Sequence, residues 1–146
     1  MAVKETLRSK LRSLRLSSML RECERLQGDR ATKGWAFEDY LEHLVSHEVQ
    51  TRESRAIENR MKKALYPAIH RLEEYDFRRM PELDEKFIAE LHNCEWIRRG
   101  DNVVYSGGHG LGKTHLAISN AVEACEKGFR VLFKKADQLV LELLEA

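Results

Sequence analysis

The glycine-rich run at residues 107–114 is the feature that most constrains what this chain can fold into. Its letters, GGHGLGKT, fit the pattern G-x-x-x-x-G-K-[ST], a loop whose backbone N–H groups surround nucleotide phosphates. Residues 102–106 predict a short buried strand before it, and residues 113–127 predict a helix after it. A phosphate loop needs these flanks, because the helix N-terminus supplies aligned N–H groups and a positive dipole end. The sequence therefore predicts a nucleoside triphosphate site and leaves the base open.

Each position of the run has an expected role. Gly107 opens the turn, while Gly110 and Gly112 can adopt the positive φ that lets successive N–H groups point at one anion. Lys113 should reach the β- and γ-phosphates as a point charge, and the hydroxyl of Thr114 should ligate Mg²⁺. A chance match in a glycine-rich turn is the alternative, which the flanking pattern disfavours. We predict no catalytic residue in this run. The predicted nucleotide-binding residues are Gly107, Gly108, His109, Gly110, Leu111, Gly112, Lys113 and Thr114.

Length and composition limit the class of protein. A chain of 146 residues with 34% charged side chains is typical of an ordinary globular domain. No apolar run approaches the ~20 residues of a membrane span, and the N-terminus has no apolar signal-peptide core. Cys23, Cys94 and Cys125 are odd in number and form no CxxC pair, which predicts reduced thiols. We therefore expect a cytoplasmic protein that does not enter the membrane.

Charge is unevenly distributed along the chain. Residues 1–64 carry 14 basic against 10 acidic side chains, whereas residues 65–146 carry 11 against 14. The basic excess is concentrated in the first fifteen residues, where Glu5 alone opposes five cations. Such a stretch fits the phosphates of a nucleic acid, and it fits the solvated face of an amphipathic helix equally well. The five cations are Lys4, Arg8, Lys10, Arg12 and Arg15.

We expect two regions, with the boundary near Pro67. Residues 1–66 form a helical N-terminal region, since apolar side chains recur at helical spacing over residues 3–27 and again from residue 36. Pro67 ends this region, because proline disfavours helix at the residue before it. Residues 67–146 form the first part of a P-loop domain.

The sequence pattern of residues 67–146 predicts the fold class. A short helix is expected over residues 84–92, followed by the strand, loop and helix around the glycine run. Gly128 should cap that helix, a second strand should span residues 130–134, and a last helix should run from residue 137 to 144. The predicted fold class is therefore α/β, with strand, P-loop, helix, strand and helix following the helical N-terminal region.

Two further groups of residues invite a functional interpretation. His43 and His47 lie four apart on a predicted helix, but no third metal ligand accompanies them, so a metal role is disfavoured. Tyr75 and Phe77 are more typical of core aromatic residues than of a platform for stacking bases.

Several blocks of the sequence resemble the IstB-like ATP-binding proteins. These are helper ATPases of insertion-sequence transposition, related to the DnaC helicase loaders within the AAA+ class. Residues 95–103, EWIRRGDNV, and residues 112–117, GKTHLA, are the most similar blocks. Residues 11–19, residues 37–60 and the acidic–aromatic segment at residues 72–77 resemble the family less specifically.

This resemblance implies a function and its partners. The helical N-terminal region would engage DNA or a transposase, and the ATPase domain would bind ATP and Mg²⁺ through residues 107–114. In such proteins ATP drives self-assembly on DNA, so the resemblance implies a homo-oligomer that recruits the transposase. By position, the segment from Tyr75 to Phe77 would lie near the adenine.

The resemblance also implies that residues needed for hydrolysis lie beyond Ala146. Hydrolysis needs an acidic residue that helps to hold Mg²⁺, a polar sensor and an arginine finger, and no candidate pair of acidic residues follows Thr114. We therefore expect a truncated product or fragment that lacks ATPase activity. A DnaC-like helicase loader is one alternative. A non-enzymatic remnant that binds DNA or a partner through its basic helices is another.

Overall fold

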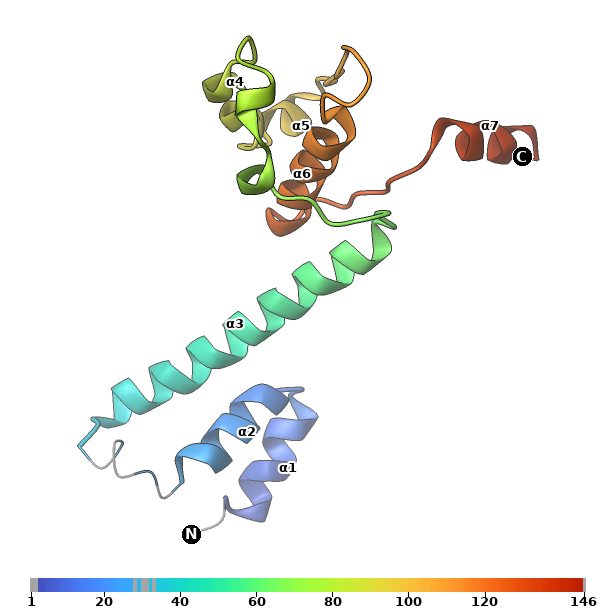
Figure 1. The fold of residues 1–146 in the computed structure, drawn as a ribbon. Helices are drawn as coiled ribbons and strands as arrows, with labels where there is room; N and C mark the ends of the chain where they lie inside the picture. Colours follow the sequence, from blue (N-terminus) through green and yellow to red (C-terminus); the bar gives the residue numbers. More distant parts are fainter. Residues whose placement is uncertain (1–2, 28, 30–31, 33, 146) are drawn as a thin grey trace. The chain divides into compact units, whose positions relative to one another are not determined.

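The computed structural model describes residues 3–27, 29, 32 and 34–145. The chain divides into two compact units, Met1–Ala56 and Ile57–Ala146 (Figure 1). The helix α3, Phe37–Lys63, contains the point of division. The boundary that the sequence predicts near Pro67 stays a prediction.

The first unit buries the apolar faces of α1 (Glu5–Ser13), α2 (Ser17–Leu26) and the first part of α3. Leucines at helical spacing on each helix point into one hydrophobic cluster. Burial of these apolar side chains is the main contribution to the stability of the unit. Leu16, Met19 and Tyr40 pack against this cluster from the side. Its buried members are Val3, Leu11, Leu20, Cys23, Leu26 and Leu44.

The helical pattern over residues 3–27 is interrupted by a turn that the sequence analysis does not anticipate. α1 ends at Ser13, and Arg15 follows in the left-handed region with a φ of +57°. The N–H of Leu16 then bonds the carbonyl of Leu11 at 2.8 Å, which closes the helix end as a Schellman motif. The turn lets two short helices pack side by side and bury Leu11 and Leu20 in the same hydrophobic cluster.

A buried carboxylate from α3 stabilises the start of α2. Oε2 of Glu48 accepts hydrogen bonds from the N–H groups of Ser18, at 3.0 Å, and Met19, at 2.8 Å. These N–H groups belong to the helix end, where no intrahelical partner exists. Arg52 donates to the other oxygen of Glu48 at 2.7 Å and to the carbonyl of Arg15 at 2.8 Å. Glu48 therefore caps a helix that is about thirty residues away in sequence.

Glu22 is a second buried carboxylate in this unit, with 6% of its side chain exposed. Its oxygens lie 2.6 Å from a guanidinium nitrogen of Arg25, 2.8 Å from Nε2 of His43 and 3.9 Å from Nε2 of His47. Hydrogen bonds from Arg25 and His43 lower the pKa of Glu22 to about 2. The two histidines that the sequence places four apart thus both face this carboxylate.

The second unit is arranged around α6, Lys113–Glu126, half of whose side chains are buried. Tyr66 donates to the carbonyl of Ala121 at 2.8 Å, and Nε of Arg60 donates to the carbonyl of Cys125 at 2.7 Å. α6 ends in a Schellman motif whose left-handed residue is Gly128, with a φ of +96°, as the sequence predicts. Its buried residues are Leu116, Ile118, Ser119, Asn120, Val122, Ala124 and Cys125.

Shorter elements complete the second unit. Two 3₁₀ turns, η2 (Leu72–Glu74) and η3 (Phe77–Arg79), precede α4 (Glu85–Leu91) and α5 (Glu95–Arg99). Asp84 caps α4 by accepting from the N–H groups of Lys86 and Phe87 at 2.9 and 3.3 Å. The last helix, α7 (Ala136–Leu144), has no buried residue. Among the described helices, none has the length and apolarity that crossing a bilayer requires.

The predicted α/β fold class is wrong for this chain. Across the described residues every regular element is a helix, and residues 102–106 and 130–134 are irregular where strands were expected. Val104, expected inside a buried strand, is 84% exposed. An apolar run becomes a strand only when its N–H and C=O groups pair with a neighbouring strand. The N–H of Phe133 instead bonds the carbonyl of Ala64, which belongs to a helical turn.

Candidate phosphate-binding loop

The glycine run forms a tight loop that leads directly into α6. Gly107, Gly110 and Gly112 have φ values of +150°, +80° and +76°, so Gly110 and Gly112 adopt the positive φ that the sequence predicts. Gly112 is the N-cap of α6, and no side chain caps that end of the helix. The first-turn N–H groups of α6 therefore remain available to an anion, together with the positive end of the helix dipole.

Lys113 and Thr114 follow as the first two residues of the helix. The ammonium group of Lys113 donates a hydrogen bond to the carbonyl of Gly108, which holds the side chain over the loop. An ammonium group has three N–H donors, so two remain for a ligand. Thr114 is exposed at the start of α6. The structure thus brings the cation, a hydroxyl group and the helix N-terminus together at one end of the loop.

Tyr75 packs against the loop from a segment almost forty residues earlier. Its hydroxyl donates to the carbonyl of Leu111 at 2.9 Å, and its ring lies edge-on to Phe77 with centroids 4.9 Å apart. A Cβ at Gly112 would lie 2.6 Å from Cε2 of Tyr75, a distance that side chains do not tolerate. Glycine is therefore required at position 112 for two reasons: the backbone has a positive φ, and the ring of Tyr75 leaves no room for a side chain.

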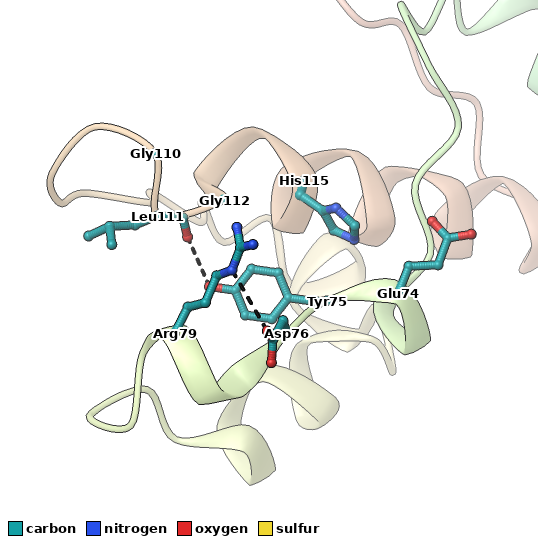
Figure 2. A pocket seen from close by; sticks show the side chains of 8 residues that line it. All are labelled: Glu74, Tyr75, Asp76, Arg79, Gly110, Leu111, Gly112 and His115. Atoms are coloured by element: carbon teal, nitrogen blue, oxygen red, sulfur yellow. Dashed lines mark hydrogen bonds and ion pairs between the residues drawn. The ribbon is translucent and has the colours of Figure 1, made fainter.

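A cavity of about 220 Å³ lies between this segment and the loop (Figure 2). Figure 2 shows the Tyr75 ring beneath the loop and His115 above the chain between Tyr75 and Glu74. The loop contributes backbone from Gly110 to Gly112, and the opposite wall contributes charged side chains. The lining residues are Glu74, Tyr75, Asp76, Arg79, Gly110, Leu111, Gly112 and His115.

The charged wall of the cavity is organised by Asp76. This carboxylate accepts from Nε of Arg78 at 2.8 Å and lies 3.7 Å from Nε of Arg79. The hydrogen bond from Arg78 keeps the pKa of Asp76 below its usual range. Because Asp76 also caps η3, accepting from the N–H of Arg78 at 3.3 Å, it fixes the turn that presents Arg79 to the cavity.

Sequence reasoning found the loop and missed most of the opposite wall. The sequence indicates Tyr75 only as a core aromatic residue or, by resemblance, as a neighbour of adenine. Arg79 and Glu74 gave no signal, because nothing in their local pattern reveals which distant segment they face. His115 follows the glycine run directly, but its sequence position does not show which segment it faces. Its Nε2 lies 2.8 Å from the carbonyl of Arg71.

Comparison with known proteins identifies the family. Residues 9–146 match the family described as IstB-like ATP binding protein. The chain belongs to the IstB-like ATP-binding protein family.

Relatives of this IstB-like chain carry names from insertion sequences. It is 36% identical to the protein named for ATP binding in insertion sequence IS21 of Pseudomonas aeruginosa, over 93% of this chain and 51% of the relative. A counterpart in insertion sequence IS5376 of Geobacillus stearothermophilus is 33% identical, over 80% of this chain and 46% of the relative. A third, in insertion sequence IS1162 of Pseudomonas fluorescens, is 34% identical, over 92% and 59%. The chain therefore spans about half the length of the curated relatives that it matches.

Proposed function

We propose that this chain binds ATP with Mg²⁺ through residues Gly107–Thr114 and acts as an ATP-binding helper in DNA transposition. The observation that carries the proposal is the N-terminus of α6. Gly112 is its N-cap, no side chain caps it, and Lys113 is its first residue. A helix end of this kind presents unpaired N–H groups to an anion. Membership of a family described by ATP binding supports the same conclusion.

In this proposal, different residues of the loop make different contributions to triphosphate binding. Gly110 and Gly112 have positive φ values, the conformation in which successive N–H groups can face one anion. Lys113 supplies a full positive charge, and its hydrogen bond to Gly108 keeps that charge at the loop before any nucleotide arrives. Pre-ordering of this kind lowers the entropic cost of binding.

The exposed hydroxyl of Thr114 fits the expected magnesium ligand, since Mg²⁺ prefers oxygen and retains several of its waters. Bound beside the phosphates, the ion would neutralise part of their negative charge. We further propose that the cavity beside Tyr75 takes part of the nucleotide, because its walls are the loop itself and the segment that resembles the family's adenine neighbour.

These 146 residues are proposed to hydrolyse ATP slowly or not at all. Three of the five acidic side chains that follow Thr114 are held in ion pairs: Glu123 pairs with Lys127 at 3.0 Å, Glu126 pairs with Arg71 at 2.8 Å, and Glu142 pairs with Lys134. A carboxylate held in such a pair on a helix surface is unsuited to positioning an attacking water. Steady-state hydrolysis that disappears in Lys113→Ala would contradict this part of the proposal.

DNA and a transposase are the proposed partners, with the first unit as the contact surface. Lys4, Lys10, Arg12 and Arg15 are exposed there. Arg8, by contrast, lies 2.7 Å from a carboxylate oxygen of Glu24. DNA binding through such cations weakens steeply as salt rises, because bound phosphates release counterions. Affinity for duplex DNA should therefore fall with salt, and no binding at low salt would remove DNA from the proposal.

A calorimetric titration of the 146-residue chain with Mg-ATP tests nucleotide binding. Wild-type chain should bind one equivalent, and Lys113→Ala should lose about 1–3 kcal/mol, the range of a charge-assisted hydrogen bond. Lys135→Ala is the matched control, because Lys135 is exposed at the start of α7 and its side chain caps nothing. Equal affinity in wild type and Lys113→Ala would refute the assignment of the loop.

A further inference from the structure

Three side chains of the second unit form a cluster, and two of them, Glu74 and His115, also line the cavity beside Tyr75. His70, Glu74 and His115 each offer one potential metal-ligand atom, and the three atoms lie within 4.8 Å of one another. His70 lies two residues before the turn η2, Glu74 is the last residue of that turn, and His115 lies in the first turn of α6. Two imidazoles and one carboxylate are a ligand set that proteins use for zinc, with a fourth position left to water.

The main chain of Arg71 orients two of these three side chains. Its N–H donates to Oε2 of Glu74 at 3.2 Å, and its carbonyl lies 2.8 Å from Nε2 of His115. The guanidinium of Arg71 also bonds Glu126 on α6 at 2.8 Å, which holds the segment against that helix. Hydrogen bonds that fix the direction of a ligand in this way are typical of the surroundings of metal sites.

The contact with Arg71 also determines the tautomer of His115. A carbonyl oxygen can only accept, so Nε2 of His115 carries the proton and donates it. In a neutral imidazole the other nitrogen, Nδ1, then has a free lone pair, which is the form a metal binds. The ring of His70 stacks on that of His115 with centroids 4.5 Å apart and an angle of 25° between planes. The two imidazoles are thus already adjacent.

We propose that His70, Glu74 and His115 bind one Zn²⁺ ion and thereby fasten the segment of η2 to the first turn of α6. Bonds of about 2.0–2.2 Å to a shared ion require the ligand atoms to approach one another by up to roughly 1.5 Å. Rotation of the exposed Glu74 and the half-buried His70 allows this. Mg²⁺ does not compete for the site, because it prefers oxygen ligands in octahedral geometry, whereas imidazole suits zinc. The zinc site therefore differs in chemistry from the magnesium position at Thr114.

Zinc affinity of the 146-residue chain, measured by competition with a zinc-chelating dye in excess MgCl₂ and without nucleotide, tests the proposal. Wild-type chain should take up one equivalent of Zn²⁺. His70→Ala, His115→Ala and Glu74→Gln should each weaken binding by roughly tenfold or more, since even residues that merely orient a ligand contribute this much. Glu74→Gln keeps the shape of an exposed side chain, and circular dichroism verifies that each variant retains its helices.

Two substitutions outside the cluster serve as matched controls for the zinc-binding variants. Glu73→Gln makes the same change in charge one residue away, and His92→Gln removes a histidine of the same unit whose Nδ1 lies near the carbonyl of Ile88. Both should bind zinc as the wild type does. The proposal is overturned if wild-type chain takes up no zinc, if the three ligand variants bind as the wild type does, or if the controls lose affinity equally. Because nucleotide is absent, the result is independent of ATP binding.

Discussion

The hydroxyl of Tyr75 donates a hydrogen bond to the carbonyl oxygen of Leu111 at 2.9 Å, which connects the acidic–aromatic segment to the phosphate loop. This contact restrains the loop two residues before Lys113. It also places an aromatic ring against Gly112, at the residue where the loop becomes a helix. The conformation of the loop therefore depends on a segment that the glycine motif does not include.

Removing only that hydroxyl should weaken nucleotide binding. We expect Tyr75→Phe to lower the affinity for Mg-ATP by about 0.5–1.5 kcal/mol, the net contribution of one hydrogen bond, while the ring continues to pack. Tyr66→Phe is the comparison, because the hydroxyl of Tyr66 bonds Ala121 within α6 and does not contact the loop. That variant should lower the unfolding temperature and leave ATP affinity unchanged. Equal affinities for Tyr75→Phe and wild type would show that the contact does not order the loop.

Gly112→Ala should abolish ATP binding through two separate effects. The positive φ of +76° costs an alanine roughly 1–2 kcal/mol, and its Cβ would lie 2.6 Å from Cε2 of Tyr75. Gly110→Ala isolates the first effect, because Gly110 lies in the same loop with a φ of +80° and has no atom within 4 Å of the added Cβ. Calorimetry should show the larger loss for Gly112→Ala. Comparable ATP affinity in both variants would contradict the close packing of Tyr75.

Glu22 should make the stability of the first unit depend on pH. Its pKa of about 2 in the folded chain lies below the ordinary value of 4.5, so the carboxylate stabilises the fold above pH 4.5. That contribution, on the order of 3 kcal/mol at most, is lost as the pH falls from about 5 towards 2. Urea unfolding, followed by Trp35 fluorescence in a Trp96→Phe background, should show a smaller loss over this range for Glu22→Gln. An unchanged pH dependence would count against the buried pairing with Arg25 and His43, and exposed Glu24→Gln provides the control.

Glu48→Gln should destabilise the start of α2. The amide retains one oxygen for the N–H groups of Ser18 and Met19, but it loses the charge that both the helix dipole and Arg52 favour. We expect the free energy of unfolding to fall by about 1–3 kcal/mol, because the group is buried and hydrogen-bonded. Glu53→Gln makes the same change at an exposed position of α3 and should have little effect. Equal unfolding curves for the two variants would refute the role of Glu48 as a cap.

The features that the sequence predicts correctly are those set by neighbouring residues. The limits of α6, the positive φ of Gly110 and Gly112 and the cap at Gly128 all follow from local backbone requirements. The strands are wrong because a strand depends on a partner elsewhere in the fold, and residues 102–106 have none within the described chain. Local rules likewise miss the approach of Tyr75 to Leu111, since only the folded chain brings them together.

Local sequence patterns also do not reveal the proposed zinc ligands, because only the folded chain brings these residues together. His70 and Glu74 lie four residues apart, a spacing that would suggest a shared helix face, yet the chain between them is a short 3₁₀ turn. Their third partner, His115, follows more than forty residues later, so no local spacing connects it with them. A search for metal sites by spacing within one helix selects His43 and His47 instead, which face Glu22.

Hydrogen exchange of the 146-residue chain, with and without Mg-ATP, tests the central claim most directly. If residues 107–114 hold the triphosphate, the amides of this loop and of the first turn of α6 should exchange more slowly in the presence of Mg-ATP. The amides of α1 and α2 should be unaffected, and Lys113→Ala should abolish the protection. Exchange in the loop that is unchanged at Mg-ATP concentrations well above those of a cell, or protection confined to other segments, would contradict the account.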